Sequence, residues 1–283
     1  MSKIAIVTDT ISCLPPELIK EYGIRVIPVG LVIDRKVYRD SELSIEKFWE
    51  LFYAAKTPVT TMAINPADYS SVFTELAGSA QNIVCITVSN LLSATHKAAV
   101  QAAAEVMKIK PGLKIEVVDS KTATGAEGFV ALEAARAAKA GKDLSEVVRR
   151  AEEIVAKVKM VATMSTLKYV VRSGRAPKSA IVGDWLKIKP VLGITTGSGL
   201  VENLSKERGM EKAISKMLEI GGSFIDAAKP LHLFVHYSDD LAMGQKIRDT
   251  LTSRYQCAEV YLTPYTPVMS SQTGPILSIA FYQ

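Results

Sequence analysis

The sequence predicts an α/β protein in which an N-terminal, mainly parallel sheet with flanking helices precedes a smaller α+β domain. Short apolar runs alternate with helical patterns through the first half of the 283 residues, as in a parallel sheet covered by helices. Beyond residue 160, two apolar runs flank a Gly-containing turn, the pattern of an antiparallel hairpin. A chain of this length usually forms one large or two moderate domains, and we expect them at residues 1–159 and 160–283.

The first elements are marked by local signals. Residues 4–7 form a short buried-strand pattern, and Pro15-Pro16 then begins a helix that Gly23 ends. Residues 24–33 are apolar almost throughout and are interpreted as the next strand.

Two further helices begin at recognisable caps. Ser44 is expected to cap a helix that runs through residue 55. Asn65 caps another, with Pro66 at its first position, and Gly78 ends that helix.

Residues 83–95 form the most informative junction. A buried strand at 83–88 leads into a loop with Ser89, Ser93 and Thr95, and a helix at 94–108 follows with Ser93 as its N-cap. A helix N-terminus presents unpaired N–H groups and partial positive charge, so the junction suits a phosphate or a carboxylate. Serine is also a common N-cap, and spacing alone slightly favours that simpler role for Ser93.

The remaining elements follow the same alternation and then change character. A strand at 114–118 is followed by a polar loop and a helix at 125–140, which Gly141 ends. Strands at 190–195 and 200–204 flank the Gly197–Gly199 turn, and a strand at 231–237 precedes a helix with Asp239 or Asp240 in its first turn. Ligands of such sheets lie beyond the carboxyl ends of the strands, here between the two domains.

Composition excludes several classes of protein. The net charge is +5, from 34 basic and 29 acidic residues, and no basic block suggests a nucleic-acid partner. No apolar run approaches the roughly 20 residues of a membrane helix, and the N-terminus lacks a signal-peptide core. We therefore expect a soluble cytoplasmic protein with no stable membrane insertion. Cys13, Cys85 and Cys257 are widely spaced and are interpreted as reduced thiols.

Motifs for catalysis and cofactors are weak. The chain has neither a dinucleotide-binding glycine fingerprint, nor a P-loop, nor a Gly-x-Ser-x-Gly elbow. Asp9 follows a strand but lacks the further acidic metal ligands of an aspartyl phosphatase, so hydrogen bonding to loop amides explains it better. His232 and His236 lie near two aspartates but are only a weak metal signal. We expect no metal, no cofactor and no catalytic residue.

The sequence resembles the DegV family over essentially its whole length. No single motif decides the resemblance, but many occur in the order and spacing of that family. They are Thr8-Asp9-Thr10 with Leu14-Pro15, Thr61 before Asn65-Pro66-Ala67-Asp68-Tyr69, Leu92-Ser93-Ala94-Thr95, Val118-Asp119-Ser120, Gly174-Arg175, Ile188-Lys189-Pro190 and Thr273-Gly274-Pro275.

This resemblance implies a two-domain protein that binds one long-chain fatty acid, such as palmitate, in an interdomain tunnel. The positions that match the family's carboxylate ligands are Thr61 and Ser93. In some members a separate fatty acid kinase phosphorylates the bound acid for phospholipid synthesis, which implies a role in lipid transport or fatty acid metabolism without catalysis by the binder. The further ligand-binding residues that we predict are Thr95, Arg175, Gln272, Thr273 and Gly274. Arg175 has an equally good structural role, as an ion pair that steadies the turn at residues 173–174.

The chain departs from the family pattern beside the expected head group. Met62 and Ala94 replace the usual Ser and Gly, Ile276 replaces a Gly, and Gln272 stands where the family has a histidine that could carry positive charge. These changes weaken the case for a kinase partner more than the case for lipid binding. A hydrolase or phosphotransferase that uses Asp9, Ser93 or His96 is the alternative function, and an interaction protein with a purely structural ligand is a third.

Overall fold

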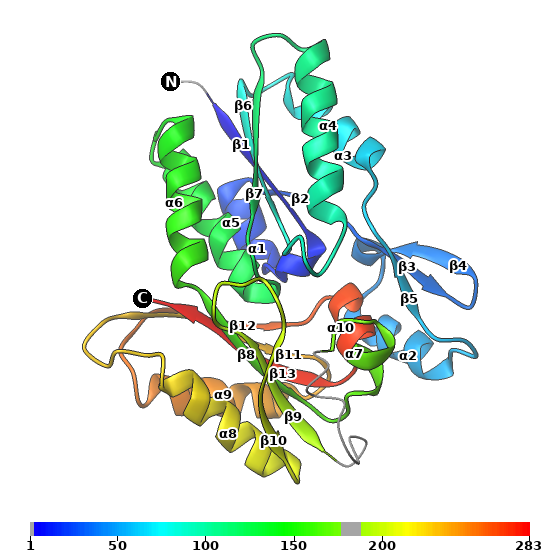
Figure 1. Ribbon diagram of the computed structural model, residues 1–283, viewed down its shortest axis with the longest axis vertical. Coiled ribbons are helices and arrows are strands. Elements are labelled where there is room, and N and C mark those ends of the chain that lie inside the picture. The colour runs from blue at the N-terminus through cyan, green and yellow to red at the C-terminus, as the bar shows by residue number, and fades with distance from the viewer. Residues whose placement is uncertain (1–2, 177–187) are drawn as a thin grey trace.

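The computed structural model describes residues 3–176 and 188–283, which form two main sheets (Figure 1). In the N-terminal part of this region, four parallel strands pair in the order β2-β1-β6-β7. The strands are β1 (Ile4–Asp9), β2 (Arg25–Ile27), β6 (Asn82–Thr87) and β7 (Lys114–Asp119). Helices α3 (Pro66–Leu76) and α4 (Thr95–Ile109) cover one face, and α1 (Pro16–Tyr22), α5 (Thr124–Lys139) and α6 (Leu144–Lys157) cover the other.

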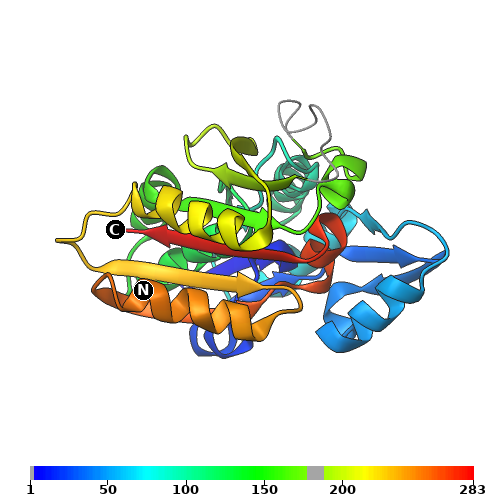
Figure 2. The same cartoon turned by 90° about the horizontal axis from the view of Figure 1, so that it is seen from below.

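The C-terminal part contains a mixed sheet of six described strands in the order β10-β9-β8-β13-β11-β12. Its pairs are antiparallel except for the parallel pair β11–β12. Helices α8 (Met210–Gly222) and α9 (Leu241–Thr252) cover its outer face, as Figure 2 shows from below. The strands are β8 (Lys159–Met164), β9 (Lys189–Ile194), β10 (Glu202–Glu207), β11 (Leu231–Tyr237), β12 (Cys257–Pro264) and β13 (Ile276–Tyr282).

The predicted fold class is therefore confirmed: an α/β part with a parallel sheet precedes a part with a mixed sheet. The expected hairpin is the antiparallel pair β9–β10, although β10 begins at Glu202 rather than at residue 200. We keep 1–159 and 160–283 as the proposed domains, because β8 begins at Lys159 and is the first strand of the mixed sheet. Across the described ranges, no helix combines the length and the hydropathy that crossing a bilayer requires.

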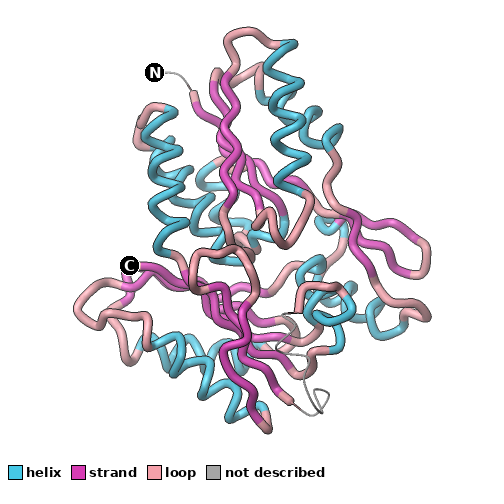
Figure 3. The backbone as a smooth tube through the Cα atoms, viewed as in Figure 1, coloured by secondary structure: helices cyan, strands magenta, loops and turns pink. Residues whose placement is uncertain are grey.

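The prediction of one strand at residues 24–33 is wrong. Only β2 joins the parallel sheet, whereas β3 (Gly30–Ile33) pairs with β4 (Lys36–Arg39) and β5 (Thr60–Met62) in a separate antiparallel sheet. Pro28 lies between β2 and β3, and a proline cannot donate a ladder hydrogen bond, so the run divides there. This small sheet and α2 (Ile45–Ala54) project from one side of the molecule (Figure 3).

The predicted helix ends are mostly confirmed. Gly23 is the left-handed C-cap of α1, Ser44 Oγ accepts the Lys47 N–H at 3.2 Å, and Asn65 begins α3 with a capping box. Asp240 is the N-cap of α9 rather than a first-turn acid, and α3 ends at Leu76, two residues before Gly78.

Helix α5 packs between the parallel sheet and the mixed sheet. Its residues 124–135 are all buried, and its side chains belong to a core cluster with Ile6 and Val84 of the parallel sheet and Phe234 and Tyr282 of the mixed sheet. A helix that is apolar or small all round is typical of such a fully buried position. The two halves of the chain therefore share one hydrophobic core along this helix.

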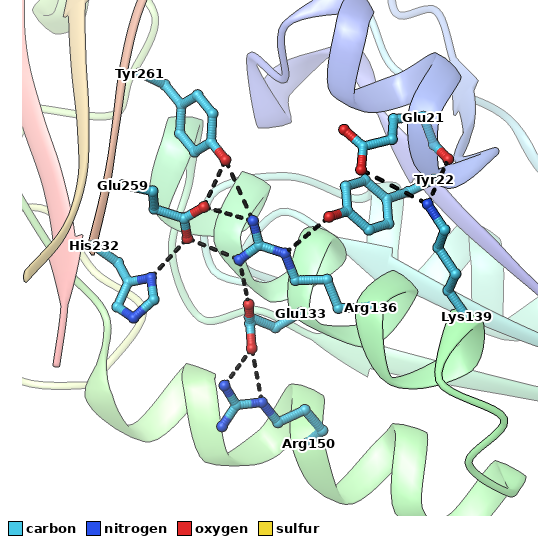
Figure 4. Close-up of polar contacts among 9 residues, drawn as sticks. All are labelled: Glu21, Tyr22, Glu133, Arg136, Lys139, Arg150, His232, Glu259 and Tyr261. Carbon is cyan, nitrogen blue, oxygen red and sulfur yellow. Dashed lines mark hydrogen bonds and ion pairs between the residues drawn. The ribbon is translucent and has the colours of Figure 1, made fainter.

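The exposed end of α5 carries a charged cluster that joins it to β12 (Figure 4). Arg136 Nη1 donates to Glu133 Oε1 at 2.7 Å and to Glu259 Oε1 at 2.8 Å. His232 and Tyr261 also contact the Glu259 carboxylate, and Arg150 contacts Glu133 from α6. We call these six residues the Arg136 cluster. Burial alone would raise the pKa of Glu259, but the hydrogen bonds from its partners, that from Arg136 above all, outweigh burial and lower this pKa well below its usual range.

Candidate functional site

A cavity lies between the parallel sheet and the mixed sheet, with walls from both halves of the chain. The space between its atoms, including the part open to solvent, is about 940 Å³. Most of its wall is apolar, with Val88 and Leu92 from the N-terminal half and side chains of β8 and β9, such as Met160, Ala162 and Leu192, from the other. Such a wall suits a long apolar ligand, and the polar residues that interrupt it determine how that ligand is oriented.

The prediction that Ser93 caps α4 is wrong by one residue. The N-cap is Ala94, which makes no side-chain cap hydrogen bond, because the chain turns before the helix, with Leu92 N and Ser93 N both bonded to Ser89 O. Ser93 Oγ instead lies 2.7 Å from Thr95 Oγ1 and accepts the Thr95 N–H at 3.3 Å. Both hydroxyls line the cavity at the start of α4, where the helix dipole favours negative charge.

Thr61 lines the same cavity but comes from a different element, the small antiparallel sheet. It lies in β5, at the edge of the small antiparallel sheet, and is half-buried, whereas its neighbour Thr60 is exposed and does not line the cavity. The small sheet is thus the element that carries this predicted residue to the cavity.

Arg175 supplies positive charge to the cavity wall. Its guanidinium donates to Leu92 O at 3.1 Å, to Ser173 O at 3.2 Å and to Gln272 Oε1 at 2.6 Å, all neutral acceptors. No carboxylate of the described residues pairs with it, and its burial lowers its pKa. These contacts therefore do not include the ion pair that was expected as the alternative role of Arg175. Arg175 contacts the turn through the Ser173 carbonyl, and its acceptors in the described part of the chain are all neutral.

The last predicted residues lie at the end of α10 (Pro267–Thr273). Gln272 and Thr273 line the cavity, but Thr273 Oγ1 already donates within the chain, at 3.0 Å to Met269 O. Gly274 does not line the cavity: its φ of 65° and the Tyr169 ring, 2.2 Å from where a Cβ would stand, explain why glycine occupies this turn. Of the seven predicted residues, the structure brings six to the cavity and places Gly274 behind it.

The sequence interpretation missed Thr124 and Tyr265, which also line the cavity. The polar loop before α5 was a partial signal for Thr124, but the predicted helix began one residue too late to include it. Tyr265 precedes α10 in a segment without a local motif, so only the fold places it at this wall.

The titratable groups near the cavity do not form a nucleophile with a base. Ser93 bonds Thr95, and His96 Nδ1 lies 3.0 Å from Thr87 Oγ1 instead. Asp9 Oδ1 accepts the Ile11 N–H at 2.8 Å, which confirms the expected hydrogen bond to a loop amide. Within residues 3–176 and 188–283, no group of three or more potential metal ligands comes together, the region of His232 and His236 included.

Asp9, at the end of β1, and Glu127, in α5, are two buried acids close to the cavity. Complete burial raises the pKa of Asp9 to about 7. Burial also raises the pKa of Glu127 well above its ordinary value, and the neighbouring Asp9 adds to this rise, while a hydrogen bond from Thr8 at 3.3 Å opposes it. The pair lies behind the cavity wall and orders it, because Ile11, which Asp9 holds through its amide, lines the cavity.

Comparisons with known proteins agree with this architecture. A family described as the DegV family of uncharacterised proteins matches residues 3–283. A DegV domain-containing protein of Caldanaerobacter subterraneus is 36% identical over 221 residues, which cover 77% of this chain and 76% of that protein.

Two solved structures have the same fold over 100% of both chains at 27% identity. They are a DegV family protein of Thermus thermophilus described by its fatty acid binding, with a TM-score of 0.89, and a fatty acid binding DegV protein of Bacillus subtilis, with a TM-score of 0.88. The family match over residues 3–283 and the 36% identity with the Caldanaerobacter subterraneus protein show that the chain belongs to the DegV family.

Proposed function

We propose that this protein binds a long-chain fatty acid, such as palmitate, in the cavity between its two halves. The observation that carries the proposal is an apolar cavity with hydroxyls from Thr61, Ser93 and Thr95 on its wall, beside a guanidinium with no acidic partner among residues 3–176 and 188–283. These groups complement a single carboxylate, and the apolar wall complements its chain. The Thermus thermophilus and Bacillus subtilis relatives, described as fatty acid binders, support the same ligand class.

The acyl chain and the carboxylate head group of the ligand contribute differently to the binding free energy. Burying roughly 15 methylenes at about 0.8 kcal/mol each contributes on the order of 12 kcal/mol, before the costs of association. A carboxylate buried without partners would cost several kcal/mol, so the hydroxyls, the N–H groups of α4 and Arg175 decide whether the head group enters. The chain thus provides affinity and the polar groups provide orientation.

A role in lipid transport or fatty acid metabolism follows from this binding, with no reaction at the site itself. Presentation of the carboxylate to a separate fatty acid kinase is part of the proposal. Here Gln272 replaces the family's histidine and accepts a hydrogen bond from Arg175, so the charge beside the head group comes from the arginine.

The direct test is the lipid content of the purified protein. Denaturing solvent extraction followed by mass spectrometry is expected to release a long-chain fatty acid, and adding such an acid to delipidated protein is expected to raise its melting temperature, because a ligand of the folded state stabilises it. Protein that carries no lipid and shows no thermal shift with any long-chain acid would contradict the proposal.

The head-group assignment has a separate test. Thr61→Ala combined with Ser93→Ala is expected to weaken fatty acid binding at least about tenfold, because hydrogen bonds to a charged group are lost in a dry site. The matched control is Thr60→Ala with Ser79→Ala, which removes two exposed hydroxyls outside the cavity. Affinity is measured by titration calorimetry with palmitate. Equal affinities for the two double variants would show that the carboxylate lies elsewhere.

A further inference from the structure

The cavity wall has a second polar region apart from the proposed head-group site. Thr124 and Tyr265 line the cavity among apolar neighbours such as Ala123, Ala162 and Ile276. Neither residue forms a hydrogen bond with Ser93, Arg175 or Gln272, and the chain of an unsubstituted fatty acid has no polar atoms beyond the carboxylate. Polar side chains on the part of the wall that faces the chain therefore call for an explanation.

Thr124 carries two energetic costs at this place. It is 1% exposed, and its Oγ1 has no hydrogen-bond partner among the described residues, which is unfavourable for a buried hydroxyl. Its φ is 60°, in the left-handed region, where a β-branched residue is strained. Strained backbone clusters at active sites and ligand-binding sites, and a buried polar group without a partner is rare in native proteins.

The N-terminus of α5 adds donors beside this hydroxyl. Ala123 is the N-cap and offers no side-chain acceptor, so the first-turn N–H groups of this sixteen-residue helix lack a side-chain cap. They carry the partial positive charge of the helix end. Thr124 is the first residue of this helix, so its unpaired hydroxyl and the free donors lie together at the cavity wall.

Tyr265 completes the region with a phenol. It is 1% exposed, and its hydroxyl lies 2.6 Å from Ser278 Oγ. Burial raises the pKa of Tyr265 far above its ordinary value, and its hydrogen bond with Ser278 offsets only part of this rise. The Thr124 hydroxyl lies close enough to act on the phenol in the same direction, but its geometry does not form a hydrogen bond with it. The phenol is therefore neutral and available to donate or accept.

His236 lies directly behind this region and adds no charge to it. Its ring centroid is 5.2 Å from that of Tyr265, and neither ring nitrogen has a partner in the described parts of the chain. Burial lowers the pKa of His236 to about 4, so the imidazole is neutral. The groups at this wall can thus satisfy a neutral polar atom, whereas Arg175 marks the place for the anion.

The separation of the two regions follows from α10. Tyr265 lies just before the N-cap of α10 and Gln272 lies in its last turn, so the two residues stand at opposite ends of this helix. A ligand whose carboxylate lies beside Gln272 therefore passes Thr124 and Tyr265 part-way along its chain.

We propose that Thr124, Tyr265 and the N-terminus of α5 form a subsite for a hydroxyl group carried part-way along the acyl chain. The proposal rests on the proposed function and names its ligand class: hydroxy fatty acids bind more tightly than unsubstituted ones. The ligand hydroxyl donates to Thr124 Oγ1 and accepts from the Tyr265 hydroxyl or from a first-turn N–H of α5. An unsubstituted chain leaves Thr124 Oγ1 unpaired.

The test compares stearic acid with a series of mid-chain monohydroxystearic acids on delipidated protein by titration calorimetry. At least one hydroxy isomer is expected to bind about fivefold or more tightly than stearic acid, as one hydrogen bond that satisfies a buried group allows. Thr124→Val keeps the shape and the β-branch, and Tyr265→Phe keeps the ring. Each is expected to lower the affinity for the hydroxy isomer more than the affinity for stearic acid, so that the preference is lost.

The matched control is Thr122→Val. Thr122 is also buried, with an unpaired Oγ1, but it does not line the cavity, so this variant is expected to keep the preference for the hydroxy acid. Melting temperatures establish whether each variant folds. If Thr124→Val does not fold, Tyr265→Phe alone decides whether the subsite exists. A wild-type protein that binds stearic acid but prefers no hydroxy isomer overturns the subsite alone. Equal losses for both kinds of acid in Thr124→Val overturn it too, whereas failure to bind any acid overturns the proposed function.

Discussion

Replacing Arg136 by Met is expected to lower the free energy of unfolding by about 2–4 kcal/mol. The variant leaves the carboxylates of Glu133 and Glu259 without the cation that joins them, and their side chains are only 8% and 14% exposed. Removing one partner of a buried charge network costs about 3–5 kcal/mol, and we take a lower range because Arg136 itself is 28% exposed and solvent screens part of the charge. Urea denaturation at neutral pH measures the change.

The control for this prediction is Arg149→Met on the neighbouring helix α6. Arg149 pairs with Glu153 at the surface, where its side chain is 66% exposed, and such pairs contribute at most about 1 kcal/mol. The two variants remove the same chemical group from ion pairs of different burial. If both lose the same stability, the Arg136 cluster does not stabilise the contact between α5 and β12.

Replacing Asp9 by Asn is expected to remove much of the loss of stability that the wild-type protein is expected to show as pH rises from about 5 to about 8. The pKa of Asp9 rises on folding from 3.8 to about 7 because of burial, so the folded state holds this proton more tightly. Its contribution to stability is complete below about pH 4 and is lost as pH rises through about 7. For this group alone, the loss between about pH 5 and about pH 8 is roughly 2–3 kcal/mol.

Urea denaturation of wild type and Asp9→Asn at about pH 5 and about pH 8 tests this. Asparagine keeps the oxygen that accepts the Ile11 N–H. Its NH₂ group replaces Asp9 Oδ2, which has no hydrogen-bond partner among the described residues, so no existing hydrogen bond is lost. The control is Asp143→Asn, an exposed N-cap whose pKa is lowered by its hydrogen bonds with Ser145 and Glu146, so this variant is expected to bring no gain at high pH. Identical pH dependence in wild type and Asp9→Asn would show that Asp9 binds no proton near neutral pH.

The features that the sequence predicts well depend on contacts within a few residues. Ser44 caps α2 through Lys47, and Asn65 caps α3 through Asp68, so each signal and its partner lie three positions apart. The division between β2 and β3 could also have been predicted from Pro28, which interrupts the apolar run. The run was instead interpreted as one strand because apolar residues continue on both sides of the proline. Ser93 shows the limit of local reasoning, since the turn back to Ser89 displaces the helix start by one residue.

The features that the sequence could not predict depend on distant partners. Arg175 and Gln272 are 97 positions apart, and nothing in either segment indicates that their side chains meet. Thr124 and Tyr265 come together only because α5 lies over the mixed sheet. The family register predicted that Thr61 and Ser93 lie at one site, and both line the cavity, but it could not distinguish Gly274, which shapes a neighbouring turn, from the residues that line it.

The burial of α5 on all sides determines how the protein as a whole comes apart. A chain with two sheets would ordinarily be divided at their junction, and each piece would be expected to fold alone. Here a fragment that ends at residue 159 would expose Phe129 and Leu132, and a fragment that begins there would lack the helix that covers Phe234 and Tyr282. The two proposed domains therefore share one helix, and separating them at residue 159 would leave apolar surface exposed on both pieces.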